Sequence, residues 1–210
     1  MKHVFHNIEQ ATIYVCAAIR KRVLEDININ NKASLVLTGG TTIISFLKNL
    51  AKIDLPWEKV YITLSDERWV DVNHELSNEK QLREHFLQFI PNVNFISLKT
   101  NHLFTNDALA EVAQRFYSIL QPFSYVLLSM GEDGHVASLF ENTELEEQQS
   151  IVCCSYYQRI HRISLSMQTL LNTKHLAILV SGFTRQDLLG QMNMQHYLWN
   201  LYKNSEKLIF

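Results

Sequence analysis

The residues best suited to acid–base chemistry lie together in the segment GEDGH at positions 131–135. A neutral imidazole is the usual general base at neutral pH, and a nearby carboxylate can fix its tautomer and stabilise the imidazolium. We therefore expect His135 to take a proton from a reacting group while Asp133 supports it. A plain turn closed by an Asx cap is the alternative interpretation of this pair.

A second segment, TGGTT at positions 38–42, has the composition of an anion cradle. Glycines let the backbone approach a ligand closely, and the N–H groups at the start of a following helix attract negative charge. Thr41 and Thr42 would add hydroxyl donors. The segment is neither a P-loop nor a dinucleotide fingerprint, because it lacks the Gly-Lys-Ser/Thr sequence and the third glycine. A tight turn is the alternative interpretation.

The chain holds only six glycines, where average usage predicts about 15 at this length. Five of them fall in three segments that follow strand-like runs: Gly39, Gly40, Gly131, Gly134 and Gly182. Ligands bind beyond the carboxyl ends of the strands in open α/β sheets. The glycines therefore indicate that these three segments are ligand-binding loops.

Other kinds of site find less support. Ser129 precedes Met130-Gly131, but no Gly-x-Ser-x-Gly elbow exposes a serine nucleophile. No helical pair of histidines suggests a metal site, and the adjacent Cys153 and Cys154 lack the spacing of zinc ligands. Together with Cys16, they are expected to be reduced thiols. We expect neither a metal nor another cofactor.

The composition is that of an ordinary globular protein, and we expect one domain over residues 1–210. With 47% hydrophobic and 19% charged residues, the chain can form a core and is not intrinsically disordered. The net charge of -2 gives no basic surface for nucleic acid. No apolar run approaches the roughly 20 residues of a membrane span, and residues 1–6 lack the apolar part of a signal peptide. We therefore expect a cytoplasmic protein without a membrane or nucleic-acid partner. The oligomeric state stays open between a monomer and a small homo-oligomer.

Strand-like and helix-like segments alternate along the chain, which is typical of an α/β protein with a mainly parallel sheet flanked by helices. Strands are predicted at 34–38, 60–64, 94–98, 125–129, 151–157, 162–166, 175–180 and 207–210. Helices are predicted at 7–26, 42–52, 77–89, 107–120, 167–172, 186–191 and 194–204, with Asn7 and Asn106 as caps. The acidic segments 65–68 and 141–149 are expected to be loops.

Four blocks of the sequence resemble the short, single-domain 6-phosphogluconolactonases, which share a superfamily with glucosamine-6-phosphate deaminase. TGGTT at 38–42 is similar to the family's Ser-Gly-Gly-Ser-Thr-Pro loop, and SDERWVDVNHELSN at 65–78 to its Asp-Glu-Arg…Ser-Asn segment. MGEDGHVASLF at 130–140 is similar to the most specific block, Gly-x-Asp-Gly-His-Thr-Ala-Ser-Leu-Phe. RISLS at 162–166 and the later Gly182-x-x-Arg185 complete the match. The resemblance implies a Rossmann-like α/β fold of the deaminase/lactonase type.

This resemblance implies hydrolysis of 6-phospho-D-glucono-1,5-lactone to 6-phospho-D-gluconate in the oxidative pentose phosphate pathway, without metal or nucleotide. His135 would activate a water molecule for attack on the lactone carbonyl, and a nearby carboxylate would provide orientation: Asp133, Asp66 or Glu67. The sugar phosphate would contact the glycine loops and two cationic side chains: Gly39, Gly40, Thr41, Thr42, Gly131, Gly134, Arg162 and Arg185. Arg68 would be either a further substrate contact or a clamp on its own loop.

The sequence departs from the family pattern at several positions. Ile43 replaces the proline that ends the first loop. Arg185 replaces a lysine, which keeps the charge and changes the geometry of the donors. Leu76, Val136 and Glu141 replace an aspartate, a threonine and a proline. None of these changes removes the proposed base or the phosphate cradle.

Two other functions stay open. The deaminases share the Gly-Gly loop and the Asp-Gly-His, but they typically read Asp-Glu-Tyr where this chain has Asp66-Glu67-Arg68. They also typically read Ala-Phe-Asn where this chain has Ala137-Ser138-Leu139. A sugar-phosphate sensor without turnover would keep the cradle, yet it would not need the pair of Asp133 and His135. These comparisons favour the lactonase.

Overall fold

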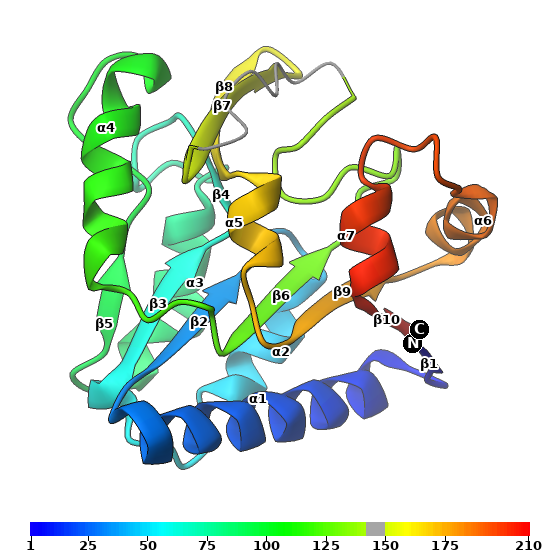
Figure 1. The fold of residues 1–210 in the computed structure, drawn as a ribbon, viewed down its shortest axis with the longest axis horizontal. Helices are drawn as coiled ribbons and strands as arrows, with labels where there is room; N and C mark the ends of the chain where they lie inside the picture. Colours follow the sequence, from blue (N-terminus) through cyan, green and yellow to red (C-terminus); the bar gives the residue numbers. More distant parts are fainter. Residues whose placement is uncertain (142–149) are drawn as a thin grey trace.

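A seven-stranded parallel sheet forms the centre of the computed structural model, which describes residues 1–141 and 150–210. Its strands are β1 Lys2–Val4, β2 Ala33–Leu37, β3 Val60–Leu64, β5 Asn94–Ile96, β6 Tyr125–Ser129, β9 Leu176–Val180 and β10 Glu206–Ile209. They lie in the order β1, β10, β9, β6, β2, β3, β5, and all neighbouring pairs run parallel (Figure 1). The mainly parallel α/β sheet expected from the sequence is confirmed.

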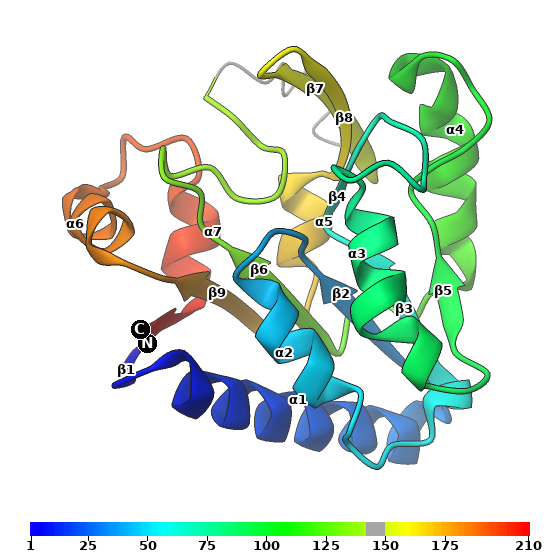
Figure 2. The same ribbon diagram turned by 180° about the vertical axis from the view of Figure 1, so that it is seen from behind.

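The helices are α1 Ile8–Asn30, α2 Ile43–Leu50, α3 Asn78–His85, α4 Thr105–Arg115, α5 Met167–Leu171, α6 Phe183–Gln191 and α7 Trp199–Asn204. Helices α2 and α3 lie behind the strands in Figure 1 and in front of them in Figure 2, whereas α4, α5 and α7 lie on the opposite face. Helix α1 runs below the strands in both views and packs against α2. No helix among residues 1–141 and 150–210 is long and apolar enough to cross a membrane.

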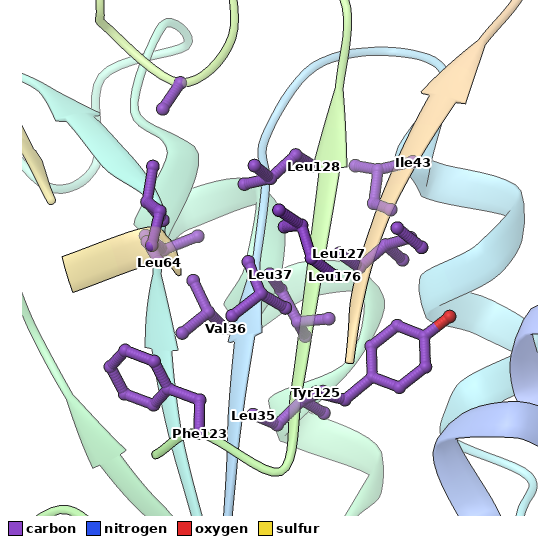
Figure 3. Packing of buried hydrophobic residues seen from close by; sticks show 14 of the residues in the cluster. Leu35, Val36, Leu37, Ile43, Leu64, Phe123, Tyr125, Leu127, Leu128 and Leu176 are labelled. Carbon is purple, nitrogen blue, oxygen red and sulfur yellow. The ribbon is translucent and has the colours of Figure 1, made fainter. Parts of the chain in front are cut away.

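The central strands are apolar along their length because helices cover both faces of the sheet. Strands β2, β6 and β9 read ASLVL, YVLLS and LAILV, and every residue of β2 and β9 is buried. Figure 3 shows side chains of these strands packed together with Leu64 of β3 and Ile43 of α2. Burial of this apolar surface is the main force that stabilises the sheet.

A second, antiparallel sheet lies above the carboxyl edge of the main sheet in Figure 1. It consists of β4 Asp66–Arg68, β8 Ile160–Leu165 and β7 Val152–Tyr157, in that order. The prediction of a loop at 65–68 is therefore wrong. A segment far along the chain supplies the partner for β4, since Asp66 pairs with Ser164, and such distant pairing leaves no local pattern in the sequence.

The order of the strands creates a switch point between β2 and β6. From β2 the chain continues through β3 to β5 on one side, and from β6 it continues through β9 and β10 on the other. The loops after β2 and β6 therefore leave the carboxyl edge in opposite directions. Ligands of open α/β sheets bind where the strand order reverses in this way.

Several predicted boundaries are wrong by a few residues. Helix α1 continues to Asn30, because Asp26 is buried and pairs with Lys174 instead of facing solvent at a helix end. Helix α4 begins at Thr105, so Asn106 lies inside the helix and does not cap it. Helix α6 begins three residues early, at Phe183, and α7 only at Trp199. The sequence predicts no strand at β1, since three residues at a sheet edge carry little pattern. Residues 142–149 of the loop expected at 141–149 lie outside the described residues.

Candidate active site

A cavity of about 210 Å³ lies at the switch point between β2 and β6. It gathers most of the residues that the sequence singled out: Gly39, Gly40, Thr41, Thr42, Asp66, Arg68, Gly131, His135, Arg162 and Arg185. The other candidates do not line it: Glu67, Asp133 and Gly134. Further residues of its wall were not among the candidates: Asn78, Ser129, Met130 and Ala137.

The glycine loop after β2 forms one wall of the cavity, at the beginning of α2. Thr42 occupies the N-cap position, and no side chain in the described part of the protein caps the helix there. The first N–H groups of a helix have no partner within it, so this end of α2 presents donors and a positive partial charge. The N–H of Gly40 is already engaged, since it donates to Oε1 of Gln81 at 2.9 Å.

Gly39 permits a close approach between this loop and α3. A Cβ atom at this position would lie 2.0 Å from Oδ1 of Asn78, closer than side chains pack. Asn78 also donates from Nδ2 to the backbone oxygen of Asp66 at 3.0 Å. One asparagine therefore holds the loop after β2, the start of α3 and β4 together. In the sequence, Asn78 marks both the start of a helix and the last position of the 65–78 block. Only its place in that block indicates that it belongs to the site.

The adjacent carboxylates of β4 have different surroundings, because successive residues of a strand point to opposite faces. Glu67 lies outside the cavity and accepts four hydrogen bonds of 2.7–3.0 Å, from the N–H groups of Arg68, Asn78 and Glu79 and from Ser77 Oγ. Burial raises the pKa of Glu67 to about 7, although these hydrogen bonds favour the ionised form. We call Glu67, Ser77, Asn78 and Glu79 the α3 anchor.

Asp66 lines the cavity and ties two loops together. Its Oδ1 accepts from Ser65 Oγ at 2.9 Å, and its Oδ2 accepts from Ser138 Oγ at 2.6 Å. Ser138 belongs to the segment that follows β6. The negative charge of Asp66 also acts on Arg162, where it opposes the loss of the guanidinium proton. Asp66 is thus both a wall of the cavity and part of the support for its cations.

Two arginines face each other in the small sheet. Arg68 and Arg162 are directly opposite in the antiparallel register of β4 and β8, and both line the cavity. Like charges in this position repel each other. Burial, together with the charge of Arg68, lowers the pKa of Arg162 below its ordinary value. The Nε atoms of both are buried without a hydrogen-bond partner among the described residues. An anion between them would relieve the repulsion and supply acceptors.

The arginines at the cavity also hold the surrounding loops. Arg68 donates from Nη1 to the carbonyl oxygen of Leu76 at 2.8 Å, which clamps the segment between β4 and α3. Arg185 of α6 donates from Nε to the carbonyl oxygen of Met130 at 2.9 Å and from Nη1 to that of Ser181 at 3.0 Å. These bonds fix the Arg185 guanidinium between the loops that follow β6 and β9.

The loop after β6 closes tightly around His135. Gly131 donates to the carbonyl oxygen of His135 at 2.8 Å, and Gly134 donates to that of Gly131 at 3.2 Å. Their N–H groups are therefore used inside the loop. A Cβ atom on Gly131 would lie 2.2 Å from Cε1 of His135, so the ring needs glycine at this position. Gly134 stands outside the cavity, where its carbonyl oxygen accepts from Tyr202 at 2.9 Å.

Asp133 fixes the orientation of the imidazole. Its Oδ1 contacts Nδ1 of His135, and its Oδ2 accepts from the Tyr157 hydroxyl at 2.8 Å. Burial alone would raise the pKa of Asp133, but the hydrogen bonds from His135 and Tyr157 outweigh it and lower the pKa below its ordinary value. A carboxylate on Nδ1 leaves Nε2 for proton transfer. The geometry is that of a general base with its orienting carboxylate.

The fold and the cavity together define the class of the protein. It is an α/β enzyme with a polar, arginine-rich cavity at the switch point of its sheet and a histidine–carboxylate pair beside it. Residues 1–141 and 150–210 contain no group of three or more His, Cys, Asp or Glu placed to hold a metal ion.

The chain belongs to the family described as glucosamine-6-phosphate isomerases/6-phosphogluconolactonase, whose sequence profile matches residues 7–198. A 6-phosphogluconolactonase of Helicobacter pylori is 34% identical over 172 residues, covering 76% of this chain and 72% of that protein. One of Synechocystis is 29% identical over 196 residues, covering 88% and 80%. The crystal structure of a 6-phosphogluconolactonase from Shewanella baltica matches with a TM-score of 0.92 at 26% identity, covering 100% of this chain and 96% of that one. The resemblance seen in the sequence is confirmed.

Proposed function

We propose that this protein hydrolyses 6-phospho-D-glucono-1,5-lactone to 6-phospho-D-gluconate, the activity for which its relatives are named. One observation carries the proposal: the same cavity is lined by the opposed arginines Arg68 and Arg162 and by the imidazole of His135. A sugar-phosphate lactone has the matching groups, an anion at one end and an electrophilic carbonyl at the other.

The phosphate is held by the start of α2 and by the two opposed arginines. Helix N-termini bind phosphate through their N–H groups and their dipole, and guanidinium groups bind it with paired hydrogen bonds. Because Gly40 donates to Gln81, Thr41 and Thr42 provide the donors of this loop. Arg185 adds positive charge at the wall between the loops after β6 and β9.

Hydrolysis then needs one group that accepts a proton and later returns it. Nε2 of His135 takes a proton from water while the water oxygen attacks C1 of the lactone. The tetrahedral intermediate collapses with cleavage of the bond between C1 and the ring oxygen, and the imidazolium returns its proton to that oxygen. One water is consumed and one carboxylic acid is formed, which ionises at neutral pH. Asp133 stabilises the imidazolium between the two steps.

The remaining features of the proposal follow from the sequence. The protein works as one domain over residues 1–210, without a metal, a nucleotide or a nucleic-acid partner. It acts on a small sugar phosphate in the cytoplasm, as a monomer or a small homo-oligomer. Glu67 belongs to the support of α3, and Asp133 and Asp66 are the carboxylates next to the chemistry.

An assay with freshly generated 6-phosphogluconolactone tests the proposal. Acid release, followed at constant pH, should exceed the spontaneous rate, and a rate equal to the spontaneous one would overturn the proposal. Glucosamine-6-phosphate should release no ammonia, since ammonia release would indicate a deaminase instead.

The phosphate end is tested separately. Arg162→Ala should raise KM by roughly tenfold or more, the equivalent of one charge-assisted hydrogen bond, with a smaller effect on kcat. Arg159→Ala is the matched control, because Arg159 lies in the exposed turn of the same β7–β8 hairpin and does not line the cavity. An unchanged KM in Arg162→Ala would place the phosphate elsewhere.

A further inference from the structure

The β7–β8 hairpin brings a tyrosine to the histidine–carboxylate pair. The hairpin turns through Gln158 and Arg159, whose φ values of 50° and 64° are both left-handed, as tight two-residue hairpin turns require. Tyr157 is the last residue of β7 and pairs with Ile160 across the turn. From this position its hydroxyl donates to Oδ2 of Asp133 at 2.8 Å.

The ring of Tyr157 is fixed as well. It stacks on Phe140 with the ring centroids 4.0 Å apart and an interplanar angle of 13°, and its centroid lies 5.8 Å from that of His135. The guanidinium of Arg162 lies over the same ring, 5.4 Å from the centroid, within the range of a cation–π interaction. Tyr157 therefore touches Asp133 through its hydroxyl and Arg162 through its ring.

Asp133 needs this support because its own loop holds it only from one side. Its side chain is 43% exposed, compared with 23% for His135. Within the loop, Oδ1 contacts the ring and the backbone N–H of His135. Tyr157 supplies the contact to the other oxygen, and it comes from a separate sheet.

We propose that Tyr157 is a positioning residue whose hydroxyl holds Asp133 and thereby sets the orientation and the basicity of His135. The inference rests on the proposed function, because it assigns His135 the part of general base. The sequence offers no sign of this role, since Tyr157 meets Asp133 only after β7 and β8 have paired. Arg162, on the neighbouring strand, would bind the phosphate of the same substrate.

The hydroxyl also changes the charge that acts on the imidazole. A donor to Oδ2 stabilises the carboxylate and draws negative charge away from the oxygen that faces His135. Without the donor, the carboxylate holds the imidazolium proton more strongly, so the imidazole stays protonated to a higher pH. The titratable and charged groups near the imidazole are Asp133 of its own loop, Tyr157 and Arg162 of the hairpin and, around the cavity, Asp66, Arg68 and Arg185.

Tyr157→Phe removes the hydroxyl and keeps the ring against Phe140 and Arg162. We expect kcat to fall about tenfold, the equivalent of one hydrogen bond to a charged group, while KM stays within about twofold of the wild type. The acid limb of the profile of kcat against pH should move to higher pH. Tyr157→Leu also removes the ring, so it should raise KM in addition, because Arg162 loses one of its two aromatic partners, Tyr157 and Phe140.

Tyr156→Phe is the matched control for this experiment. Tyr156 is the neighbour in the same strand, is 61% exposed and packs on His161 with the ring centroids 4.7 Å apart. This variant should keep the wild-type kcat, KM and pH profile. An unchanged kcat in Tyr157→Phe, or a lower kcat with an unmoved acid limb, would overturn the inference, because a merely structural role leaves the acid limb in place.

An NMR titration of the His135 imidazole protons makes the test independent of the substrate. The midpoint of the titration should lie at higher pH in Tyr157→Phe than in the wild type, and equal midpoints would overturn the role of Tyr157. A wild-type protein that fails to accelerate lactone hydrolysis would overturn the proposed function, and the titration would still decide whether Tyr157 acts on His135.

Discussion

The α3 anchor and the loop around His135 each place a carboxylate near the cavity, but the two carboxylates differ in almost every respect. Glu67 of the anchor is 1% exposed and accepts four hydrogen bonds from the protein, whereas Asp133 is 43% exposed and divides its oxygens between His135 and Tyr157. Burial raises the pKa of Glu67 to about 7, and hydrogen-bonding partners lower that of Asp133. The buried carboxylate of Glu67 supports the fold, whereas the more exposed carboxylate of Asp133 contacts His135, a residue that can exchange protons.

The largest expected effect is a loss of kcat from a substitution in the loop around His135. His135→Ala should lower kcat by about 10²–10⁴-fold, the usual contribution of a general base, and leave Tm near that of the wild type. Steady-state hydrolysis of the lactone and a thermal melt measure the two quantities. His102→Ala is the control, because His102 is exposed and does not line the cavity. A variant with the wild-type rate would remove His135 from the mechanism.

Glu67→Gln should act on folding instead of catalysis. Both oxygens of Glu67 accept from N–H or O–H donors, so an amide NH₂ group would face donors, and the free energy of unfolding should fall by about 2–4 kcal/mol. Asp66→Asn is the matched control, since the hydroxyl groups of Ser65 and Ser138 can rotate and accept from the new amide. Chemical denaturation measures both variants. Equal losses would contradict the distinction between anchor and cavity.

The close approach of Gly39 to Asn78 of the α3 anchor predicts a smaller loss of stability. The new methyl group of Gly39→Ala would displace Asn78, and we expect the free energy of unfolding to fall by about 1–3 kcal/mol, with a higher KM because the phosphate loop moves as well. Gly190→Ala is the control. Nothing lies within 4 Å of a Cβ atom there, and the residue is in α6, so alanine should stabilise the protein by about 0.5–1 kcal/mol. Denaturation of both variants gives the sign of each effect.

The most gradual predicted effect is a dependence of stability on pH that comes from the anchor. The pKa of Glu67 rises from 4.5 to about 7 on folding, so between these values the folded protein holds a proton that the unfolded chain has released. The free energy of unfolding should therefore fall as the pH rises through this window, by at most about 1.4 kcal/mol per pH unit, and level off above it. Denaturation across the window should show a flatter curve for Glu67→Gln, and parallel curves would contradict the prediction.

Much of the fold and the position of the cavity could be predicted from the sequence, because both depend on local signals. Apolar runs such as 34–38 mark buried parallel strands, and the rare glycines mark the loops that follow them. The alternation of strands and helices then places those loops at one edge of the sheet. Gly40 and His135 reach the same cavity for this reason, although they are far apart in the chain.

The rest depends on contacts that no local pattern records. Asp66 and Glu67 look alike in the sequence, and only the pairing of β4 with β8 turns one toward the cavity and the other toward α3. Tyr157 reads as an ordinary strand residue until the hairpin brings it to Asp133. These assignments require the three-dimensional neighbours of each side chain.

The opposed arginines of the small sheet make the stability of the protein depend on its ligand. Arg68 and Arg162, which are directly opposite in the β4–β8 register, repel each other, and an anion bound between them would remove that repulsion. A ligand that binds only the folded state shifts the folding equilibrium toward that state. Inorganic phosphate or sulfate should thus raise the melting temperature more than chloride at equal ionic strength, and Arg162→Ala should lose this response. The thermal melt then measures the fraction of the protein that has an anion bound, without any turnover. Substrate and product should in the same way stabilise the enzyme that converts them.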